Sequence, residues 1–596
     1  MPESVSSPFA WVRPAARWIL PSVSEDAVLP IQSNLNLQRL AAAVLVRRGF
    51  TDVRAASEFL HPSLASLHDP FLMLDMETAV MRLQQAVQAR EPILIYGDYD
   101  VDGTSSIIVL KKAIEILGGQ ADFHVPHRLT EGYGMRADVI ERAGQSGVRL
   151  IVSVDTGIRA NDVVRHANAM GMDVIVTDHH LPQTELPPAL AVLNPNRPDC
   201  KYPDKNLCGA GVTLKLVEAL LNRSDLPEPK KSALLDSFLK PVAIATVADI
   251  VPLTGENRVI VHRGLSGLRE VRNPGLRALL LVAGFEDGER PSAHQVAFRL
   301  APRINAAGRM ATARDVIELF LTQDALRARE LAEQLDALNR ERQQVEVDIV
   351  DAILKECEET GFDYSCSATV FAAAGWHLGV LGIVASRLVE RLCRPVFVLS
   401  DAMESAAAEE GCLSGSGRSI PAFHLLEALE SMPDLFKRFG GHRQAAGLTL
   451  HPGQLEEFRQ RFNRFAASRL TFEDLRPEFT VDAEAAFSEL TEHCIRDVLA
   501  LGPFGFGNPA PIFYTCSVEV AGPVKSFKDG KHLSVPLRHQ RRTLFCKAWN
   551  FGDRAALFEP GAKLDILFQI EDDPNSRKRG WGSWCVSVKD ARPSPA

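Results

Sequence analysis

Short apolar runs alternate with amphipathic stretches from about residue 76 to residue 320. Each run is bounded by polar residues and is too short for a buried helix, which is typical of a strand in a parallel sheet. The stretch Ala137–Gln145, between two of the runs, carries apolar residues at helical spacing. This alternation predicts an α/β domain built on a parallel sheet. The predicted strands lie at 93–96, 121–125, 150–154 and 173–177.

A continuous helical pattern replaces this alternation from about residue 324 to residue 356, without Gly or Pro. Its apolar positions follow one helix face, and they are Leu331, Leu335, Leu338, Val345 and Ile349. A helix of ~30 residues is ~45 Å long, enough to join two domains across a gap. The same pattern also fits a helix that packs along one domain, so both arrangements stay open.

Two further regions follow this helix. Residues 366–400 return to an α/β pattern, and the chain from about 475 onward has short alternating runs separated by turns such as Asp529-Gly530, which predicts a small β-barrel. The predicted organisation is an N-terminal segment at 1–75 without assigned chemistry, a parallel α/β domain at 76–323, a connector helix at 324–356, a smaller α/β domain at 357–472 and a barrel domain at 473–596.

The composition is that of an ordinary multidomain globular protein, with 596 residues of which 46% are hydrophobic and 24% charged. There is no uninterrupted apolar stretch of about 18 residues and no basic start followed by an apolar core, so neither a membrane span nor a secretory signal is predicted. The ten cysteines are scattered without a Cys-x-x-Cys pair, which argues against a zinc ribbon or a disulfide framework and predicts a reducing cytoplasm. The net charge of −9 does not by itself favour a nucleic-acid partner, but local patches matter more than the total.

Three of the apolar runs end at acidic residues. One leads to Asp98, Asp100 and Asp102, the second to Asp155, and the third to Asp178-His179-His180. If the first strand continued through its acidic residues, the alternation of side chains would point all three carboxylates the same way. Ligands bind beyond the carboxyl ends of parallel strands, which is where these residues fall. A group of carboxylates this dense is costly unless cations neutralise it, so the runs predict a metal site of a hydrolytic kind.

A two-ion site fits this set of ligands. Carboxylates supply oxygen atoms, and imidazole favours Mn²⁺ over Mg²⁺ when both are available. Two ions ~3.5–4 Å apart would activate water and stabilise the leaving oxygen of a phosphodiester. Asp249, which follows an apolar run of small residues, could close the site. Any single member could instead be a helix cap or a surface charge, but that interpretation fits the whole set poorly.

Several ordered motifs resemble those of a known enzyme family. The Asp98–Asp102 run, Val154-Asp155-Thr-Gly157, Asp178-His179-His180 and Val-Ala-Asp249 resemble the four motifs of the DHH phosphoesterase superfamily. From about residue 75 to 590, the remaining motifs resemble in order those of the bacterial RecJ single-stranded-DNA exonucleases. These motifs are Val-Pro-His-Arg128, Gly132-Tyr133-Gly134, Pro302-Arg303-Ile-Asn305-Ala-Ala-Gly308-Arg309, Gly375-Trp376-His377, Ser416-Gly-Arg418-Ser, Gly440-Gly441-His442 with Gly447, and Pro503-Phe-Gly505-Phe-Gly507-Asn508-Pro509.

The resemblance implies two Mn²⁺ or Mg²⁺ ions and a role for each ligand. Asp100 and Asp102 would each hold one ion, and Asp155 would bridge both. His180 would act beside the ligands or on the phosphate. The implied metal ligands are Asp98, Asp100, Asp102, Asp155, His179 and Asp249, and the implied catalytic residues are Asp100, Asp102, Asp155, His179, His180 and Asp249.

One position departs from the family pattern. Some relatives carry a histidine ligand four residues before the position that matches Asp100, and Tyr96 stands there in this chain. Tyr96 or Asp98 could take the place of that ligand, and the resemblance leaves the choice open.

The resemblance also implies a substrate site. In the family, the DHH-associated domain binds substrate opposite the metals, and its glycines let the backbone approach phosphates. A pocket for a terminal 5′-phosphate would use arginine, whose planar fork binds phosphate through two hydrogen bonds. The implied substrate-binding residues are Arg128, Arg303, Asn305, Arg309, Ser416, Arg418, Gly440, Gly441 and His442. Without the resemblance, a Gly-Gly-His string is more often a turn, and an isolated arginine is a surface residue.

The barrel region has the composition of a single-strand-binding surface. Basic residues can follow a DNA backbone, aromatic residues can stack on bases, and OB-fold barrels offer such surfaces. Seven basic residues and Asp529 give a local charge of +6, with aromatic residues between them: Lys525, Lys528, Lys531, Arg538, Arg541, Arg542 and Lys547, and Phe527, Phe545 and Trp549. Each aromatic residue could instead belong to the barrel core, but the local charge is harder to explain that way.

These implications combine into one expected function. We expect a metal-dependent exonuclease that degrades single-stranded DNA 5′→3′ to mononucleotides in DNA repair and recombination, through a channel too narrow for duplex. Single-strand-binding protein and a helicase are candidate partners, no membrane is involved, and a monomer is expected. One alternative is a DHH phosphodiesterase of short oligonucleotides or cyclic dinucleotides, which the basic barrel argues against. The other is a non-catalytic DNA-binding scaffold, which the complete carboxylate set argues against.

Overall fold

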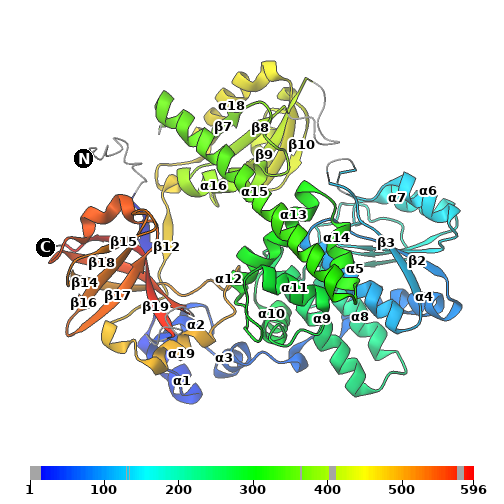
Figure 1. The fold of residues 1–596 in the computed structure, drawn as a ribbon, viewed down its shortest axis with the longest axis horizontal. Helices are drawn as coiled ribbons and strands as arrows, with labels where there is room; N and C mark the ends of the chain where they lie inside the picture. The colour runs from blue at the N-terminus through cyan, green and yellow to red at the C-terminus, as the bar shows by residue number, and fades with distance from the viewer. Residues whose placement is uncertain are drawn as a thin grey trace. The chain divides into compact units, whose positions relative to one another are not determined.

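The computed structural model describes residues 15–128, 131–132, 134–362, 365–401, 411–573 and 583–595. Tyr133 and the N-terminal residues predicted to lack a secretory signal lie outside the described residues. The chain forms two compact units (Figure 1). One comprises Leu64–Thr471 with Gly505–Gly507, and the other comprises the chain up to Ser63, Phe472–Phe504 and the chain from Asn508 onward. No described helix combines the length and the apolar character needed to cross a membrane.

The first unit begins with a parallel sheet of five strands in the order β3-β2-β4-β5-β6. The strands are β2 (Pro92–Tyr96), β3 (Gln120–His124), β4 (Leu150–Val154), β5 (Asp173–Thr177) and β6 (Ala191–Leu193). The four predicted strands are confirmed, and the short edge strand β6 is additional. Because β3 and β4 pair with opposite sides of β2, the strand order reverses at the carboxyl end of β2.

Helices cover both faces of this sheet. They are α4 (Met76–Ala89), α5 (Val101–Ile116), α6 (Ala137–Gln145), α7 (Asn161–Ala169) and α8 (Gly209–Asn222). Alternate residues of β2 enter different cores, as the pleat of a strand requires. Ile93 and Ile95 share a core with α5 and α8, whereas Leu94 and Tyr96 share one with α6 and α7. The helix predicted over Ala137–Gln145 is confirmed.

The predicted connector is α15 (Ala325–Thr360), a single helix of 36 residues. It follows a group of shorter helices: α9 (Glu228–Ala248), α10 (Gly255–Gly267), α11 (Pro274–Val282), α12 (Ala293–Gln295), a π-helical turn at Val296–Leu300, α13 (Ala301–Met310) and α14 (Arg314–Leu321). Leu331 and Leu335 of α15 are buried in the core of the first α/β part. Farther along the helix, Glu346 pairs with Arg387 of α16. One helix therefore packs along the first part and also leads to the next.

A second α/β part follows, with a sheet in the order β10-β11-β9-β8-β7. Its strands are β7 (Thr369–Ala372), β8 (Val396–Ser400), β9 (Leu413–Arg418), β10 (Phe436–Gly441) and β11 (Ala445–Leu450), and its helices are α16 (Leu381–Leu392), α17 (Leu425–Glu430) and α18 (Leu455–Arg469). Within this sheet, β7 and β8 are parallel and the other pairs are antiparallel. Phe397 of β8 packs edge-on against Phe458 and Phe462 of α18, with ring centroids 5.4 and 5.3 Å away.

The other unit is a closed β-barrel with N-terminal helices packed on it (Figure 1). The ring closes because β14 pairs with both β18 and β16. Its strands are β14 (Phe513–Val520), β16 (His532–His539), β17 (Arg542–Ala548), β18 (Lys563–Asp572) and β19 (Trp584–Pro593), with β13 (Ala483–Glu484) and β15 (Lys525–Phe527) at the margins. The helices are α1 (Glu25–Leu35), α2 (Arg39–Arg47), α3 (Val53–Leu60) and α19 (Glu492–Ala500), and β1 (Arg17–Ile19) pairs with β12 (Glu478–Thr480). The predicted barrel is confirmed.

Candidate active site

The ends of the three acidic runs meet at the carboxyl edge of the first sheet. Asp98 follows β2, Asp155 directly follows β4, and Asp178 directly follows β5. In parallel sheets, ligands bind in the crevice where the strand order reverses. The structure places that crevice between β2 and β4, next to Asp98 and Asp155.

The strand geometry expected for the Asp98–Asp102 run is wrong. β2 ends at Tyr96, and Asp100 instead caps helix α5. The Asp100 Oδ1 atom accepts hydrogen bonds from the backbone N–H groups of Asp102 at 2.9 Å and Gly103 at 3.0 Å. A carboxylate at a helix N-terminus satisfies free N–H groups and is favoured by the helix dipole. Gly103 is required because a Cβ there would lie 2.5 Å from the Asp98 carbonyl oxygen.

A second helix N-terminus holds Asp102. Its carboxylate oxygens accept hydrogen bonds from the N–H groups of Gly209 at 2.6 Å and Ala210 at 2.8 Å, the first residues of α8. Asp155 approaches the same helix end, since a Cβ at Gly209 would lie 2.5 Å from Asp155 Oδ1. The glycine therefore allows two carboxylates to meet at one helix end.

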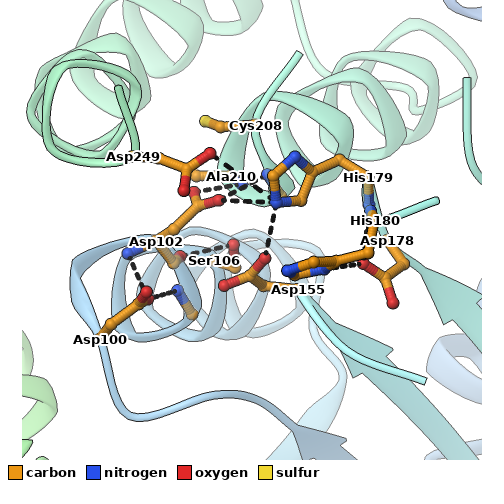
Figure 2. A network of polar contacts seen from close by, with 12 residues as sticks. Asp100, Asp102, Ser106, Asp155, Asp178, His179, His180, Cys208, Ala210 and Asp249 are labelled. Carbon is orange, nitrogen blue, oxygen red and sulfur yellow. Dashed lines mark hydrogen bonds and ion pairs between the residues drawn. The ribbon is translucent and has the colours of Figure 1, made fainter. Parts of the chain in front are cut away.

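His179 and Asp249 complete this acidic group (Figure 2). The His179 Nε2 atom lies 3.3 Å from Asp155 Oδ1, 3.7 Å from Asp249 Oδ2 and 3.8 Å from Asp102 Oδ2. Asp249 comes from the C-terminal end of α9, so the small-residue run before it is a helix. Three sets of residues each offer ligand atoms within 4.8 Å of one another: Asp98, Asp100 and Asp155; Asp102, His179 and Asp249; and Asp155, His179 and His180.

Four buried atoms of the acidic group lack hydrogen bonds. Within the described residues, no hydrogen-bond partner is found for Asp98 Oδ1, Asp155 Oδ1, His179 Nε2 and Asp249 Oδ2. A buried polar atom without a partner costs ~1–3 kcal/mol, so several in one place indicate a missing ligand. Carboxylate oxygens suit Mg²⁺ and Mn²⁺, and the imidazole nitrogen favours Mn²⁺. The donor set therefore fits divalent metal ions.

Burial and mutual repulsion raise the pKa values of these carboxyl groups. Burial is the main cause for Asp98 and Asp155, whose pKa values rise well above the usual range, and neighbouring carboxylates add to the effect. Burial, together with the charges of Asp102 and Asp100, raises the pKa of Asp249 to about 9. Burial also lowers the pKa of His179, which keeps the imidazole neutral and able to bind a metal.

The metal-free protein is expected to lose stability as the pH rises. A carboxyl group with a higher pKa in the folded state binds more protons when folded. Its stabilising contribution is complete below the unfolded pKa of about 4 and disappears as the pH rises through the folded pKa. For Asp249 the stabilising contribution is therefore lost between about pH 4 and about pH 9. Because metal ions compete with these protons, Mn²⁺ should raise the melting temperature more at about pH 8.5 than at about pH 6, relative to EDTA. An equal Mn²⁺ effect at both pH values would contradict this expectation.

Asp178 positions the two histidines. Its Oδ1 atom lies 2.7 Å from His180 Nδ1 and accepts the N–H of His179 at 2.8 Å, while Oδ2 accepts the N–H of Ile158 at 3.0 Å. Burial acts to lower the pKa of His180, but the bond to Asp178 outweighs it and the pKa is raised. Asp178 is therefore a support for His180 and belongs to none of the three ligand sets.

Tyr96 and Asp98, the two candidates for the histidine position, have different surroundings. Its hydroxyl donates a hydrogen bond to the Gly134 carbonyl at 3.2 Å, and its ring is buried in the core shared with α6 and α7. Asp98, two residues later, offers an oxygen beside those of Asp100 and Asp155. Of the two candidates left open by the sequence, the structure brings Asp98 into the acidic group.

A cleft of about 400 Å³ adjoins the acidic group at Tyr99. Tyr99, Arg128 and Gly132 of the first α/β part form one side, and residues of β9, β10 and β11 form much of the other. Three of the predicted substrate-binding residues line this cleft, namely Arg128, Ser416 and Gly440. The structure therefore brings together residues separated by about 300 positions in the chain.

Among the cleft residues that escaped prediction are Tyr99, Arg438 and Phe439. Tyr99 lies between two predicted ligands, and Arg438-Phe439 directly precedes Gly440. Adjacency to a motif was therefore the only signal available for them in the sequence.

Arginines gather beside the cleft. Arg309 donates a hydrogen bond to the carbonyl of Gly379, a cleft residue, at 2.9 Å. Burial, together with the charges of Arg128, Arg342 and Arg418, lowers the pKa of Arg309 to about 9. Burial and the Arg128 charge also lower the pKa of Arg418. Cations that destabilise one another in this way favour an anion between them.

Arg303 and Asn305 hold α13 in place and do not line the cleft. Arg303 pairs with Asp336 of α15 at 2.8 Å. The Asn305 side-chain oxygen accepts the N–H of Val101, next to Asp100, at 3.2 Å. These contacts position α13, and the substrate contacts predicted for the two residues stay a prediction.

Gly441 is the last residue of β10, and His442 begins the turn to β11. The His442 N–H donates to the Ala445 carbonyl at 2.8 Å, and the φ of Gly441 is +149°. Burial lowers the pKa of His442, and the charge of Arg418 adds to this effect. His442 therefore lies within electrostatic reach of the arginines, although the turn does not line the cleft.

The aromatic residues of the barrel differ in exposure. Phe545 on β17 is 76% exposed, whereas Phe527 and Trp549 pack edge-on with ring centroids 5.6 Å apart. Arg538, Arg542 and Lys547 have partners within the unit: Glu519, the carbonyls of Phe487 and Leu490, and Asp573. In the described part of the chain, no ion pair is found for Lys525, Lys528, Lys531 and Arg541. An exposed ring and unpaired cations thus occur in the same region of the barrel.

Family models match three parts of the chain. The DHH family N-terminal domain matches residues 92–246, the DHHA1 domain matches 366–468 and the RecJ OB domain matches 481–579. The single-stranded-DNA-specific exonuclease RecJ of Bacillus subtilis is 38% identical over 96% of this chain, which covers 70% of that relative. The chain belongs to the RecJ family.

RecJ similarity extends along the whole fold. RecJ of Escherichia coli is 37% identical over 82% of this chain, which covers 85% of that relative. The crystal structure of RecJ in complex with Mn²⁺ from Thermus thermophilus has a TM-score of 0.81 and 30% identity, over 98% of this chain and 80% of that one. The predicted family, fold class and domain types (DHH, DHH-associated and OB barrel) are confirmed.

Proposed function

We propose that this RecJ-family chain hydrolyses single-stranded DNA from the 5′ end to mononucleotides, with two Mn²⁺ or Mg²⁺ ions in the acidic group. The named relatives are single-stranded-DNA-specific exonucleases, and similar RecJ structures are complexes with Mn²⁺ and with Mg²⁺. The observation that carries the proposal is the junction at Tyr99, where the acidic group adjoins a cleft flanked by arginines.

The three ligand sets support two overlapping metal positions. Asp155 belongs to two of the sets, as a bridging carboxylate would. The proposed ligands are Asp98 and Asp100 for one ion, Asp102, His179 and Asp249 for the other, and Asp155 for both. Bound ions would supply Lewis-acid activation of water and would offset the charge that develops on phosphate. His180, held by Asp178, would donate a hydrogen bond to a phosphate oxygen.

Hydrolysis adds water to the phosphorus atom and breaks the bond to the 3′ oxygen of the terminal nucleotide. The 3′ oxygen takes up a proton, and the shortened strand keeps the phosphate as its new 5′ end. Arg128, Arg309 and Arg418 would bind that terminal phosphate, because guanidinium groups bind phosphate through paired hydrogen bonds. Each turnover would then restore the group that the arginines bind.

We also propose that the barrel binds the single strand. Phe545 offers an exposed ring, and the neighbouring lysines offer charge for the backbone. Replacing Phe545 by alanine should weaken binding of a single strand in EDTA by ~5–150-fold, since stacking on one base is worth ~1–3 kcal/mol. Fluorescence anisotropy with the full chain measures this change.

Phe472 provides the matched control, because it is 70% exposed in the same unit. The Phe472→Ala variant should bind the strand as the unmodified chain does. Equal weakening by both substitutions, or none by Phe545→Ala, would contradict the proposed surface.

The remaining proposals concern the cellular setting. All ten cysteines are free, which suits a reducing cytoplasm. An exonuclease for single strands needs unpaired DNA, which a helicase produces and a single-strand-binding protein covers, so these are the proposed partners of a monomer in DNA repair and recombination.

The order in which labels leave the two ends of a strand tests the proposed direction: the 5′ label should leave first.

A further inference from the structure

Tyr99 lies close to both the acidic group and the arginines. It stands between Asp98 and Asp100 in the chain and lines the cleft together with Arg128. The guanidinium carbon of Arg128 lies 5.2 Å from the centre of the Tyr99 ring, within the range of a cation–π contact. The residue therefore adjoins both sites at once.

Helix α13 holds the backbone of Tyr99. A Cβ at Gly308 would lie 2.6 Å from the Tyr99 carbonyl oxygen, so the helix packs directly on this residue. Asn305 of the same helix accepts the N–H of Val101 at 3.2 Å. These two contacts fix the backbone on either side of Asp100, so the position from which the Tyr99 side chain extends is also fixed.

The surroundings of Tyr99 suit one nucleoside. Leu378 and Phe439 provide apolar surface in the same cleft, and Arg438 provides charge. A Cβ at Gly440 would meet no atom within 4 Å, so glycine there leaves open space that the packing of the protein does not require. A cleft of about 400 Å³ that combines an aromatic wall with the polar side chains of Arg128, Ser416 and Arg438 has the character of a small-ligand site.

We infer that Tyr99 determines the length of the released product, by filling the gap between the two phosphate sites so that one nucleoside fits and two do not. The inference rests on the proposed function. If the arginines bind the terminal 5′-phosphate and the ions act on the next phosphate, the nucleoside between them lies against Tyr99. The aromatic ring would contact its sugar or base and exclude a second nucleoside.

The test uses the full chain in excess over a single strand with a radiolabelled 5′-phosphate, in Mn²⁺. The unmodified chain should release the label as a mononucleotide. In Tyr99→Ala, the ratio of labelled mononucleotide to labelled dinucleotide among first products should fall by ~10–200-fold, the range that a lost steric contact gives in substrate selection. Tyr99→Phe should keep the mononucleotide product, and Tyr99→Leu should give an intermediate ratio.

Melting temperatures in EDTA and in Mn²⁺ show whether each variant folds and binds metal. A folded Tyr99→Ala variant that releases only mononucleotides would overturn the inference. A folded variant that releases no product of any length would also overturn it, because loss of a spacer relaxes the selection of length and leaves the metal ligands in place. Failure of the proposed function would appear elsewhere, in the unmodified chain, as release of the 3′ end first or no release.

Discussion

An Asp155→Asn variant is expected to hydrolyse single-stranded DNA at least about 10³-fold more slowly than the unmodified chain. Asp155 belongs to two of the three ligand sets, and its Oδ1 is buried without a hydrogen bond in the described structure. Metal ions stabilise a phosphoryl-transfer transition state by several kcal/mol, and ~4 kcal/mol corresponds to about 10³-fold in rate. Single-turnover hydrolysis of a labelled strand in saturating Mn²⁺ measures the loss.

Asp162 is the matched control for Asp155. It lies exposed in the first turn of α7, where it pairs with Arg165 at 2.7 Å, and Asp162→Asn should keep the unmodified rate. Because burial raises the pKa of Asp155, its charge destabilises the metal-free fold, so Asp155→Asn should raise the melting temperature in EDTA. An Asp155→Asn variant that keeps more than about one-tenth of the rate would contradict the two-ion assignment.

An Arg418→Ala variant is expected to lose the preference for strands that carry a 5′-phosphate. Arg418 is half-buried and lies within electrostatic reach of Arg128 and Arg309, and Gly382 leaves room for its guanidinium group. Hydrogen bonds to charged groups contribute ~1.5–3 kcal/mol each, and a bidentate contact makes two. Hydrolysis of a 5′-phosphorylated strand should therefore fall by ~10²–10⁴-fold, while hydrolysis of a 5′-hydroxyl strand should change by less than about threefold.

Two further variants show whether the effect of Arg418→Ala comes from the lost charge, from the lost planar group or from a general loss of an arginine. Arg418→Lys keeps the charge but loses the planar fork, so it should recover part of the preference. Arg391 is an exposed arginine in the last turn of α16, and Arg391→Ala should leave both rates unchanged. An equal loss on both strands in Arg418→Ala would show that the arginine supports the fold instead of reading the 5′ end.

The periodicity of the sequence predicted the elements better than it predicted their ends. Buried strands leave a strong apolar signal, so β2 to β5 were located to within about two residues. The common direction expected for Asp98, Asp100 and Asp102 required the strand at 93–96 to continue through them, and nothing in the alternation marks whether it does. Helix capping decides the conformation of this run. Asp100 accepts a hydrogen bond from an N–H group at the N-terminus of α5, and Asp102 accepts one at the N-terminus of α8. These hydrogen bonds stabilise the observed conformation over an extended strand.

Long-range pairs account for what the sequence could not predict. Arg303 was expected to contact DNA, and nothing in the sequence indicated that it also pairs with Asp336, 33 positions away on α15. β1 pairs with β12 across more than 450 positions, so the N-terminal segment could not be assigned to the barrel unit in advance. The cleft likewise joins Tyr99 to Phe439. Motifs can indicate residues for such a site, but only the fold shows which of them meet.

The most direct test of the central claim is the order in which labels leave the two ends of one strand. The strand carries a radiolabelled 5′-phosphate and a fluorophore at its 3′ end, and the unmodified chain acts on it in Mn²⁺, with EDTA as the metal-free control. Cleavage from the 5′ end predicts labelled mononucleotide at the earliest times, while the 3′-labelled fragments shorten gradually. Release of short 3′-labelled fragments before any 5′ label, or equal release in EDTA, would contradict hydrolysis from the 5′ end at a metal site.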